Sequence, residues 1–239
     1  MRKLVALLLL VLLLVVVDRV AVSVAEGQIA DRVQTSQSLP QRPSADIAGF
    51  PFLTQVLRGR YKQVGLQVQG LEREGLRLSD IRLDAEGVRV DPGDLISGTV
   101  SSVPVDHARG EVLVSYEDLN AYLANRVEVP KITVARDGQD LRVTGTVELP
   151  LLNRPVSLSG NARIDIAGDD VTLLPEAVQT VTGFLPDFAE GSAREALTVR
   201  FSIDGLPLGV RLDSARATDE GLLFTAVGDG LTLDTRMAG

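Results

Sequence analysis

Residues Val156–Ile166, with the sequence VSLSGNARIDI, decide the fold because apolar and polar side chains alternate along the whole stretch. In an extended segment, one face would carry aliphatic and small side chains, and the other would carry polar ones. Such alternation is typical of an antiparallel sheet with one dry and one wet face. Leu141–Leu149 repeats the pattern, and Gly145 and Gly160 fall on the apolar faces of the two segments. A glycine there permits a sharp bend or close packing.

Helical spacing surrounds the expected sheet at three places. Residues 18–34 repeat apolar side chains every three or four positions, which predicts a helix with one apolar stripe. Residues 115–126 open with Ser115 and Asp118 in a capping pattern, which predicts a second helix. Residues 186–198 predict a third. Because a sheet with one apolar face must be covered, these helices are its expected cover.

Two further apolar segments complete the expected organisation. Residues 47–57 contain two of the six phenylalanines, and their spacing predicts a short helical turn. Residues 173–188 are rich in leucine, valine and phenylalanine, and we interpret them as an apolar connection that is buried or touches an apolar partner. We expect a single domain over residues 18–239, with its sheet and remaining helices between residues 45 and 233.

The first seventeen residues have the pattern of an export signal. Arg2 and Lys3 precede fourteen uninterrupted apolar residues, Leu4–Val17, as in a signal peptide. Since positive charge stays on the cytoplasmic side, the rest of the chain is expected outside the membrane. Fourteen residues are fewer than the about 20 that span a bilayer, but apolar residues continue to Ala25. Both a signal cleaved at Ser23–Ala25 and a retained membrane anchor fit the sequence.

Composition excludes several classes of protein. The net charge is −8 over 239 residues, with both signs mixed along the chain. Nucleic-acid binding needs a basic patch, so no nucleic-acid partner is expected. The chain has no cysteine, which removes disulfides and thiolate metal sites. Aromatic residues make up only 4%, so the interior must be built from aliphatic side chains. We expect no metal and no cofactor.

Candidates for catalysis are few. The single histidine, His107, follows Asp106, but no nearby serine has a nucleophile-elbow context. We interpret His107 as a solvated loop residue. Acidic pairs could flank a sugar bond in a glycosidase, but those of this chain lie beside glycines at expected turns; they are Glu72/Glu74, Asp169/Asp170 and Asp219/Glu220. The prediction is a protein that is not an enzyme, with no catalytic residue.

The aliphatic face of the sheet leaves two structural alternatives. The helices either seal this face into an ordinary core or leave an aliphatic space between helix and sheet. Such a space suits acyl chains, because burial of each methylene stabilises a complex by about 0.8 kcal/mol and needs no polar partner. Both alternatives fit the pattern of residues.

Four motifs, in this order along the chain, resemble a known family. They are Gly49–Leu53 (GFPFL), Gly59–Tyr61 (GRY), Ser115–Leu119 (SYEDL) and Leu206–Leu212 (LPLGVRL). Together with the export segment, they resemble the LmeA-like family of actinobacterial exported envelope proteins, over about residues 18–233. That family is similar in fold to the tubular lipid-binding (TULIP) superfamily, which includes the bactericidal/permeability-increasing protein.

The resemblance implies an α+β fold in which a strongly curved antiparallel sheet wraps around a long helix, with an apolar groove. It implies binding of phospholipid or another acyl lipid at the periplasmic, outer face of the plasma membrane, in support of lipoglycan or mannan assembly such as that of lipomannan. It maps no catalytic residue onto the chain. Two alternatives stay open: an accessory protein that binds envelope glycosyltransferases, and a glycan hydrolase.

The residues expected to line or gate the groove are large apolar side chains of the helical segments. They are Phe50, Phe52, Leu53, Val56, Leu57, Leu119, Tyr122, Leu123, Phe184 and Phe188. Ordinary core packing is the alternative for each. If residues 1–17 are retained, they tether the groove to the membrane; if they are cleaved, the domain is a free shuttle.

Overall fold

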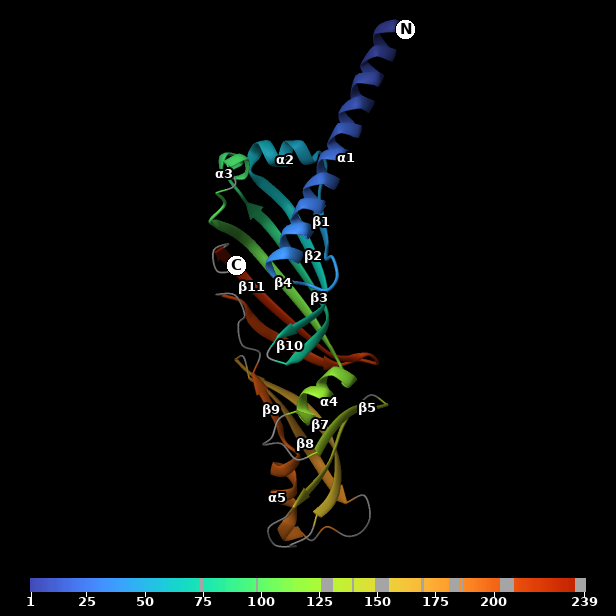
Figure 1. The fold of residues 1–239 in the computed structure, drawn as a ribbon, viewed down its shortest axis with the longest axis vertical. Coiled ribbons are helices and arrows are strands. Elements are labelled where there is room, and N and C mark those ends of the chain that lie inside the picture. Colours follow the sequence, from blue (N-terminus) through green and yellow to red (C-terminus); the bar gives the residue numbers. More distant parts are fainter. Residues whose placement is uncertain are drawn as a thin grey trace.

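The chain folds into two antiparallel sheets that follow one another along an elongated molecule (Figure 1). The computed structural model describes residues 1–73, 75–97, 99–125, 131–138, 140–148, 155–168, 170–180, 185, 187–202 and 209–234. Sheet A has six strands in the order β1 (Ser44–Ala48), β2 (Arg60–Arg73), β3 (Leu76–Arg89), β4 (Ser102–Ser115), β11 (Gly221–Asp234) and β10 (Arg211–Ala217). Sheet B has five, in the order β5 (Lys131–Asp137), β6 (Asp140–Glu148), β7 (Pro155–Ala167), β8 (Asp170–Thr180) and β9 (Val199–Ser202).

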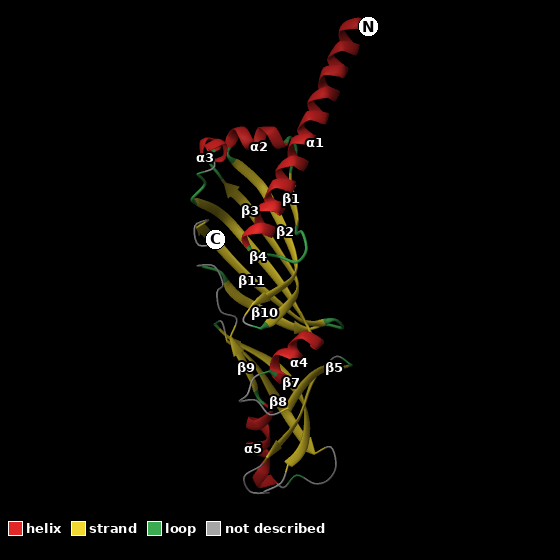
Figure 2. Ribbon diagram, in the orientation of Figure 1, coloured by secondary structure: helices red, strands yellow, loops and turns green. Residues whose placement is uncertain are grey.

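Five helices accompany the sheets in the described residues: α1 (Arg2–Ser36), α2 (Phe52–Arg58), α3 (Pro92–Ser97), α4 (Tyr116–Ala124) and α5 (Asp187–Leu197). Figure 2 shows sheet A curling beside α1, with α2 and α3 at one end of it, α4 between the sheets and α5 along sheet B. The predicted α+β fold, with a curved antiparallel sheet and a long N-terminal helix, is confirmed. The strands are divided between two sheets, and α1 accompanies only sheet A.

The long helix α1 joins the export segment and the predicted amphipathic helix into one element. It begins at Arg2 instead of near Asp18 and ends at Ser36. In its second half, Val22 and Ala30 are buried, and Ala25 and Ile29 pack against residues of sheet A, as the predicted stripe requires. In its first half, Leu4–Val17 projects from the domain, and all of these residues except Val15 are exposed (Figure 1).

Sheet B confirms the alternation on which the sequence analysis was built. Val143 of β6 and Leu158 of β7 are completely buried. The two glycines on this face allow close packing. A Cβ at Gly145 would lie 3.0 Å from Leu197 Cδ2 of α5, and a Cβ at Gly160 would lie 2.3 Å from the carbonyl oxygen of Ala177 in β8.

The interpretation of residues 173–188 as a connection is wrong for its first half, because Asp170–Thr180 forms strand β8. This strand pairs with β7 on one side and β9 on the other. Val171, Leu173 and Pro175 are buried, but Leu174 puts a further apolar side chain on the opposite face, which hides the alternation in the sequence. Pro175 is tolerated within it because the register shifts between its partner Ala162 and Asn161, and prolines in strands are confined to edges and bulges. The helix predicted for residues 186–198 is confirmed as α5.

The predicted caps and short helices are also confirmed. The Ser115 hydroxyl accepts a hydrogen bond from the Asp118 N–H at 3.0 Å and so caps α4. Leu119 and Leu123 of α4 enter a core that contains residues of both sheets, including Leu158 and Leu222. We call it the junction core. The short helix predicted within residues 47–57 is α2, but strand β1 before it was not predicted.

Candidate functional site

The candidate site is the inner face of sheet A, which we define as the face against which α1 and α2 pack. Small residues on three adjacent strands meet on this face. Ala85 of β3 pairs with Ala108 of β4, which pairs with Gly228 of β11. In the next inward-facing row, Gly110 lies between Leu83 and Ala226. The small-residue strip, formed by Ala85, Ala108, Gly110, Ala226 and Gly228, therefore crosses the middle of the sheet.

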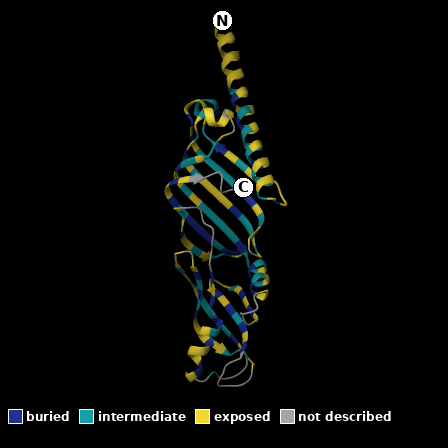
Figure 3. Ribbon diagram, turned by 60° about the vertical axis from the view of Figure 1, so that its left-hand side comes forward, coloured by how far each residue is buried: buried dark blue, intermediate teal, exposed yellow. Residues whose placement is uncertain are grey.

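The inner face of sheet A is only partly covered. Val64, Leu66, Ala85 and Ala108 are half-buried, and Leu83 is 44% exposed. Sheet B differs sharply, since the side chains of its core are dry; Val134, Val143, Leu158, Val171 and Leu173 are each 0% exposed. Figure 3 marks the buried, intermediate and exposed residues along the strands of both sheets.

The two sheets therefore differ in how far their apolar faces are covered. Sheet B and the junction core form the sealed core, whereas the inner face of sheet A keeps aliphatic surface in contact with water. Within the small-residue strip, Ala226 and Gly228 are buried, so the part-open surface lies around Leu83, Ala85, Ala108 and Gly110. An apolar surface of this kind favours an apolar ligand over a polar one.

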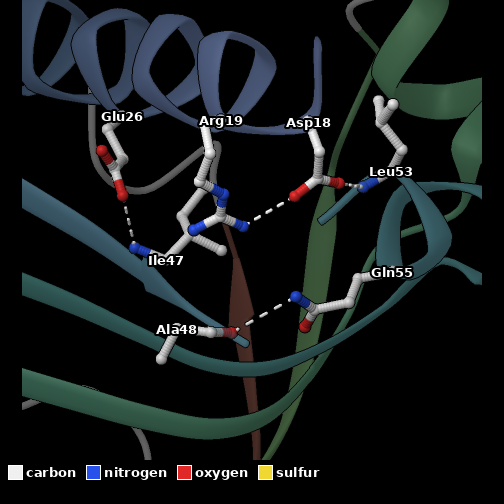
Figure 4. A network of polar contacts seen from close by, with 7 residues as sticks. All are labelled: Asp18, Arg19, Glu26, Ile47, Ala48, Leu53 and Gln55. Carbon is white, nitrogen blue, oxygen red and sulfur yellow. Dashed lines mark hydrogen bonds and ion pairs between the residues drawn. The ribbon is translucent and has the colours of Figure 1, made fainter. Parts of the chain in front are cut away.

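A buried carboxylate fixes α1 to the end of this face (Figure 4). Asp18 is 2% exposed, and its carboxylate accepts hydrogen bonds from Arg19 Nη2 at 2.7 Å and from the Leu53 N–H at 2.8 Å. Because no side chain within α2 caps its own N-terminus, Asp18 takes that role from α1. Burial alone would raise the pKa of Asp18, but the Arg19 hydrogen bond and the N–H groups of Leu53 and Phe52 outweigh it and lower that pKa.

Two further side chains hold α1 and α2 to the edge of sheet A (Figure 4). Glu26 of α1 accepts a hydrogen bond from the Ile47 N–H of the edge strand β1 at 3.0 Å. Gln55 of α2 donates to the Ala48 carbonyl at 3.3 Å, and its Oε1 accepts from the Lys62 N–H at 2.8 Å. Residues after Val17 are thus an integral part of the fold.

The predicted site residues of α2 lie at the end of the inner face. Phe52 is buried, with its ring centroid 6.3 Å from that of Tyr61, and burial raises the pKa of the Tyr61 phenol. Leu53 and Val56 are partly buried in the same cluster. Phe50 and Leu57 are 61% and 81% exposed.

The other predicted site residues lie elsewhere. Leu119 and Leu123 are buried in the junction core, and Tyr122 packs against it. Phe188 is 64% exposed on α5, beside sheet B. Phe184 lies outside the described residues. The structure therefore does not bring the nine described residues of this set into one lining. The sequence analysis did not predict Leu83 or the small-residue strip. In the sequence, the strip is marked only by alanine and glycine residues that alternate with larger residues along the strands.

A polar hollow on the outer face of sheet A contains His107. The histidine is exposed, as predicted, but it lies in strand β4 and not in a loop, and its Nδ1 contacts Asp229 of β11. Asp106 instead pairs with Arg89. The described residues that line the hollow include Gln63, Asp84, Glu86 and Arg109, and none of them is a serine, threonine or cysteine.

The acidic pairs give no converging carboxylates where they can be described. Asp219 is almost fully exposed and forms an ion pair with Arg136 at 2.7 Å. Glu74 and Asp169, from the other two pairs, lie outside the described residues. Among the described residues, no three His, Asp or Glu side chains lie close enough to hold a metal ion.

A curled antiparallel sheet that presents a part-open apolar face to a long N-terminal helix is the architecture of TULIP-like lipid-binding proteins. The family comparison agrees with this class. The chain belongs to the LmeA-like phospholipid-binding family, whose model matches residues 16–227. Comparison with curated proteins found no match, and comparison with solved structures found none either.

Proposed function

We propose that this chain is an exported phospholipid-binding protein of the cell envelope, held at the outer face of the plasma membrane by α1. The proposal is supported by family membership and by the length and apolar character of α1, whose most apolar 18-residue window has a mean hydropathy of 2.9 and is only 11% buried. Residues Leu4–Val17 would lie in the bilayer, while residues from Asp18 onward belong to the folded domain.

The part-open inner face of sheet A carries the proposal. An acyl chain would lie over the small-residue strip, in contact with Leu83, and would replace water on surface that α1 does not cover. At about 0.8 kcal/mol for each buried methylene, ten methylenes would contribute about 8 kcal/mol. That free energy corresponds to micromolar binding before the cost of ordering the lipid is subtracted. The headgroup would stay near water.

We propose that the bound lipid serves lipoglycan or mannan assembly, as the family resemblance implies, and that the chain supplies the lipid without itself catalysing a reaction. The lipid-binding character of the family supports this role, and no serine, threonine or cysteine is among the described residues around His107. The chain would present or carry lipid, and other proteins of the envelope would perform the chemistry.

Photo-crosslinking tests the proposed binding face. The full chain in vesicles that contain a phospholipid with a photoreactive acyl chain is irradiated and then digested. Adducts are expected on peptides from β3 and β4, which carry Leu83 and Gly110, and not on peptides from the sealed sheet B. Adducts confined to Leu4–Val17 of α1 would show contact with bulk lipid only, and they would overturn the proposed site.

A second candidate function is contact with an envelope glycosyltransferase. The outward side of α1 favours it, because Val16, Val20 and Val24 form an i, i+4 stripe and are 51%, 58% and 54% exposed. A membrane helix of a partner would cover this stripe. Co-purification of a glycosyltransferase that is lost in Val20→Asp, together with the absence of bound lipid, would favour this candidate over the first.

A further inference from the structure

We propose that the end of the domain formed by α2 and α3 docks onto the phospholipid surface of the bilayer that holds residues Leu4–Val17. The docking surface consists of Phe50, Leu57 and Leu95. The inference rests on the proposed function only in taking α1 as retained in the membrane; it adds a second membrane contact and a defined orientation of the domain.

Exposed apolar side chains are concentrated at this end. Outside α1, the exposed large apolar residues of the described chain are Phe50, Leu57, Leu83, Leu95 and Phe188. Three of the five belong to the docking surface, with exposed fractions of 61% for Phe50, 81% for Leu57 and 42% for Leu95. Leu83 lies on the inner face and Phe188 on α5. Exposed apolar groups that gather on one side of a protein indicate a surface that is covered in use.

The position of α1 identifies the bilayer as the cover. The apolar block leaves the domain at the end where α2 and α3 lie (Figure 1). It ends at Val17, and the next residue, Asp18, is bonded to the Leu53 N–H at the start of α2. When the block is embedded, α2 is therefore held at the level where the chain enters the bilayer. The docking surface is continuous with a segment that is already in lipid.

The polar groups at this end suit a lipid interface. The Arg19 guanidinium lies 5.2 Å from the centroid of the Phe50 ring, and Arg58 is exposed in the last turn of α2. Aromatic rings and arginine side chains are typical of the boundary between headgroups and acyl chains. Asp91, just before α3, and Asp94 within it lie at the same end, so we expect apolar insertion, and not net positive charge, to drive docking.

Docking in this way would orient sheet A end-on to the membrane. The inner face begins at Phe52 and Tyr61, next to the docking surface. A phospholipid could then pass between the bilayer and the inner face without crossing bulk water. Sheet B and α5 would point away from the membrane.

Site-specific fluorescence tests the orientation. Because the native chain has no cysteine, single cysteines can be introduced as Leu57→Cys and Leu95→Cys, with Phe188→Cys as the exposed control far from the docking surface. Each full-length variant is labelled with a polarity-sensitive fluorophore and reconstituted in phosphatidylcholine/phosphatidylglycerol vesicles. The unfolding temperature of each labelled variant is compared with that of the unmodified chain to show that it is folded. Because two docking positions are labelled, the test still stands if one of these variants does not fold.

Labels at positions 57 and 95 are expected to emit as in an apolar medium and to be quenched by lipids with a spin label near the headgroup. The label at 188 is expected to emit as in water and to escape quenching. Water-like emission at both 57 and 95 would overturn the proposal, and so would equal quenching at 188. Lipid extracted from the same samples reports on the proposed function separately, so a failure of docking is distinguishable from a failure of lipid binding.

Discussion

Truncation of α1 separates its membrane segment from its folded segment. A chain that begins at Val16 loses only residues that make no buried contact with the domain, because positions 1–14 are all exposed and Val15 is only half-buried. A chain that begins at Glu26, as cleavage after Ala25 would produce, also loses Asp18 and Val22, which are 2% and 7% exposed. We predict that the first truncated chain keeps the stability of the domain and that the second does not.

The size of the difference follows from the lost contacts. Val22 packs in a cluster with Phe52, Tyr61 and Val88, and full burial of a valine is worth about 1.5–3 kcal/mol. For a domain of this size, 1 kcal/mol shifts the midpoint of thermal unfolding by about 2–4 °C. The loss of Val22 alone therefore predicts a decrease of roughly 3–12 °C. Loss of the Asp18 cap on α2 and of the Ala21 contacts adds to it.

Thermal unfolding of the two truncated chains, both without the apolar block, measures this difference. Val22→Ala in the chain that begins at Val16 is the matched control and should account for most of the valine's contribution, about 1.6 kcal/mol, since it removes two carbons of the side chain and keeps Asp18. Equal unfolding temperatures for the two chains would refute the reasoning and would restore cleavage at Ser23–Ala25 as compatible with the fold. The predicted result favours a retained anchor.

Further predictions concern the core, pH and the far end of the domain. Gly160→Ala should lower the free energy of unfolding in urea by about 1–3 kcal/mol, because its Cβ would meet the Ala177 carbonyl. Gly191→Ala, with open space around it in α5, should raise that free energy by about 0.5–1 kcal/mol. A Gly160→Ala variant more stable than Gly191→Ala would contradict the packing. The pKa of Asp18 in the folded chain is lowered from 3.8, so ionised Asp18 contributes fully to the free energy of unfolding above pH 3.8. This contribution is lost as the pH falls through the pKa of the folded state. Acidification should therefore destabilise the native chain more than the Asp18→Asn variant. A variant as acid-sensitive as the native chain would exclude Asp18 as the cause. Phe188→Ser should leave bound lipid unchanged in extracts, since Phe188 lies on α5 beside sheet B, and a loss of lipid would move the site to that sheet.

Local signals predicted much of the fold. Alternation over Val156–Ile166 gave a strand with the correct face inward, and the Ser115–Asp118 pattern gave the start of α4. Helical spacing after Asp18 gave the stripe of α1 that contacts sheet A. These features depend on neighbours close in sequence, so sequence alone carries them. Strand β8 was missed because Leu173 and Leu174 put apolar side chains on both of its faces, and because Pro175 sits at a bulge that only its partner strand reveals.

The candidate site was harder to predict because it depends on strand register. Leu83, Gly110 and Ala226 lie far apart in sequence and meet only when β3, β4 and β11 pair. Apolar residues of the predicted helical segments were the natural candidates for the lipid site, but they differ in burial. Leu119 and Leu123 pack in the junction core, whereas Phe50 and Leu57 are exposed. Size and polarity alone do not tell a core leucine from a lining one, since both avoid water for the same reason.

Two glycines of sheet A allow the proposed lipid face to be blocked with a matched control. A Cβ at Gly110 would lie 3.2 Å from Leu83 Cδ2 on the inner face, and the exposed Leu83 side chain has room to move. A Cβ at Gly65 would lie 3.5 Å from Asp84 Oδ1 and point to the outer face. Gly110→Leu and Gly65→Leu thus add the same side chain to opposite faces of one sheet.

The most direct test of phospholipid binding by this face is mass spectrometry of the lipid extracted from the purified full-length chain and from these two variants. Phospholipid should accompany the native chain and Gly65→Leu, and it should be reduced by about tenfold or more in Gly110→Leu, because an added leucine occupies the place of several methylenes. Equal amounts of phospholipid in all three proteins, or none in the native chain, would contradict the proposed site.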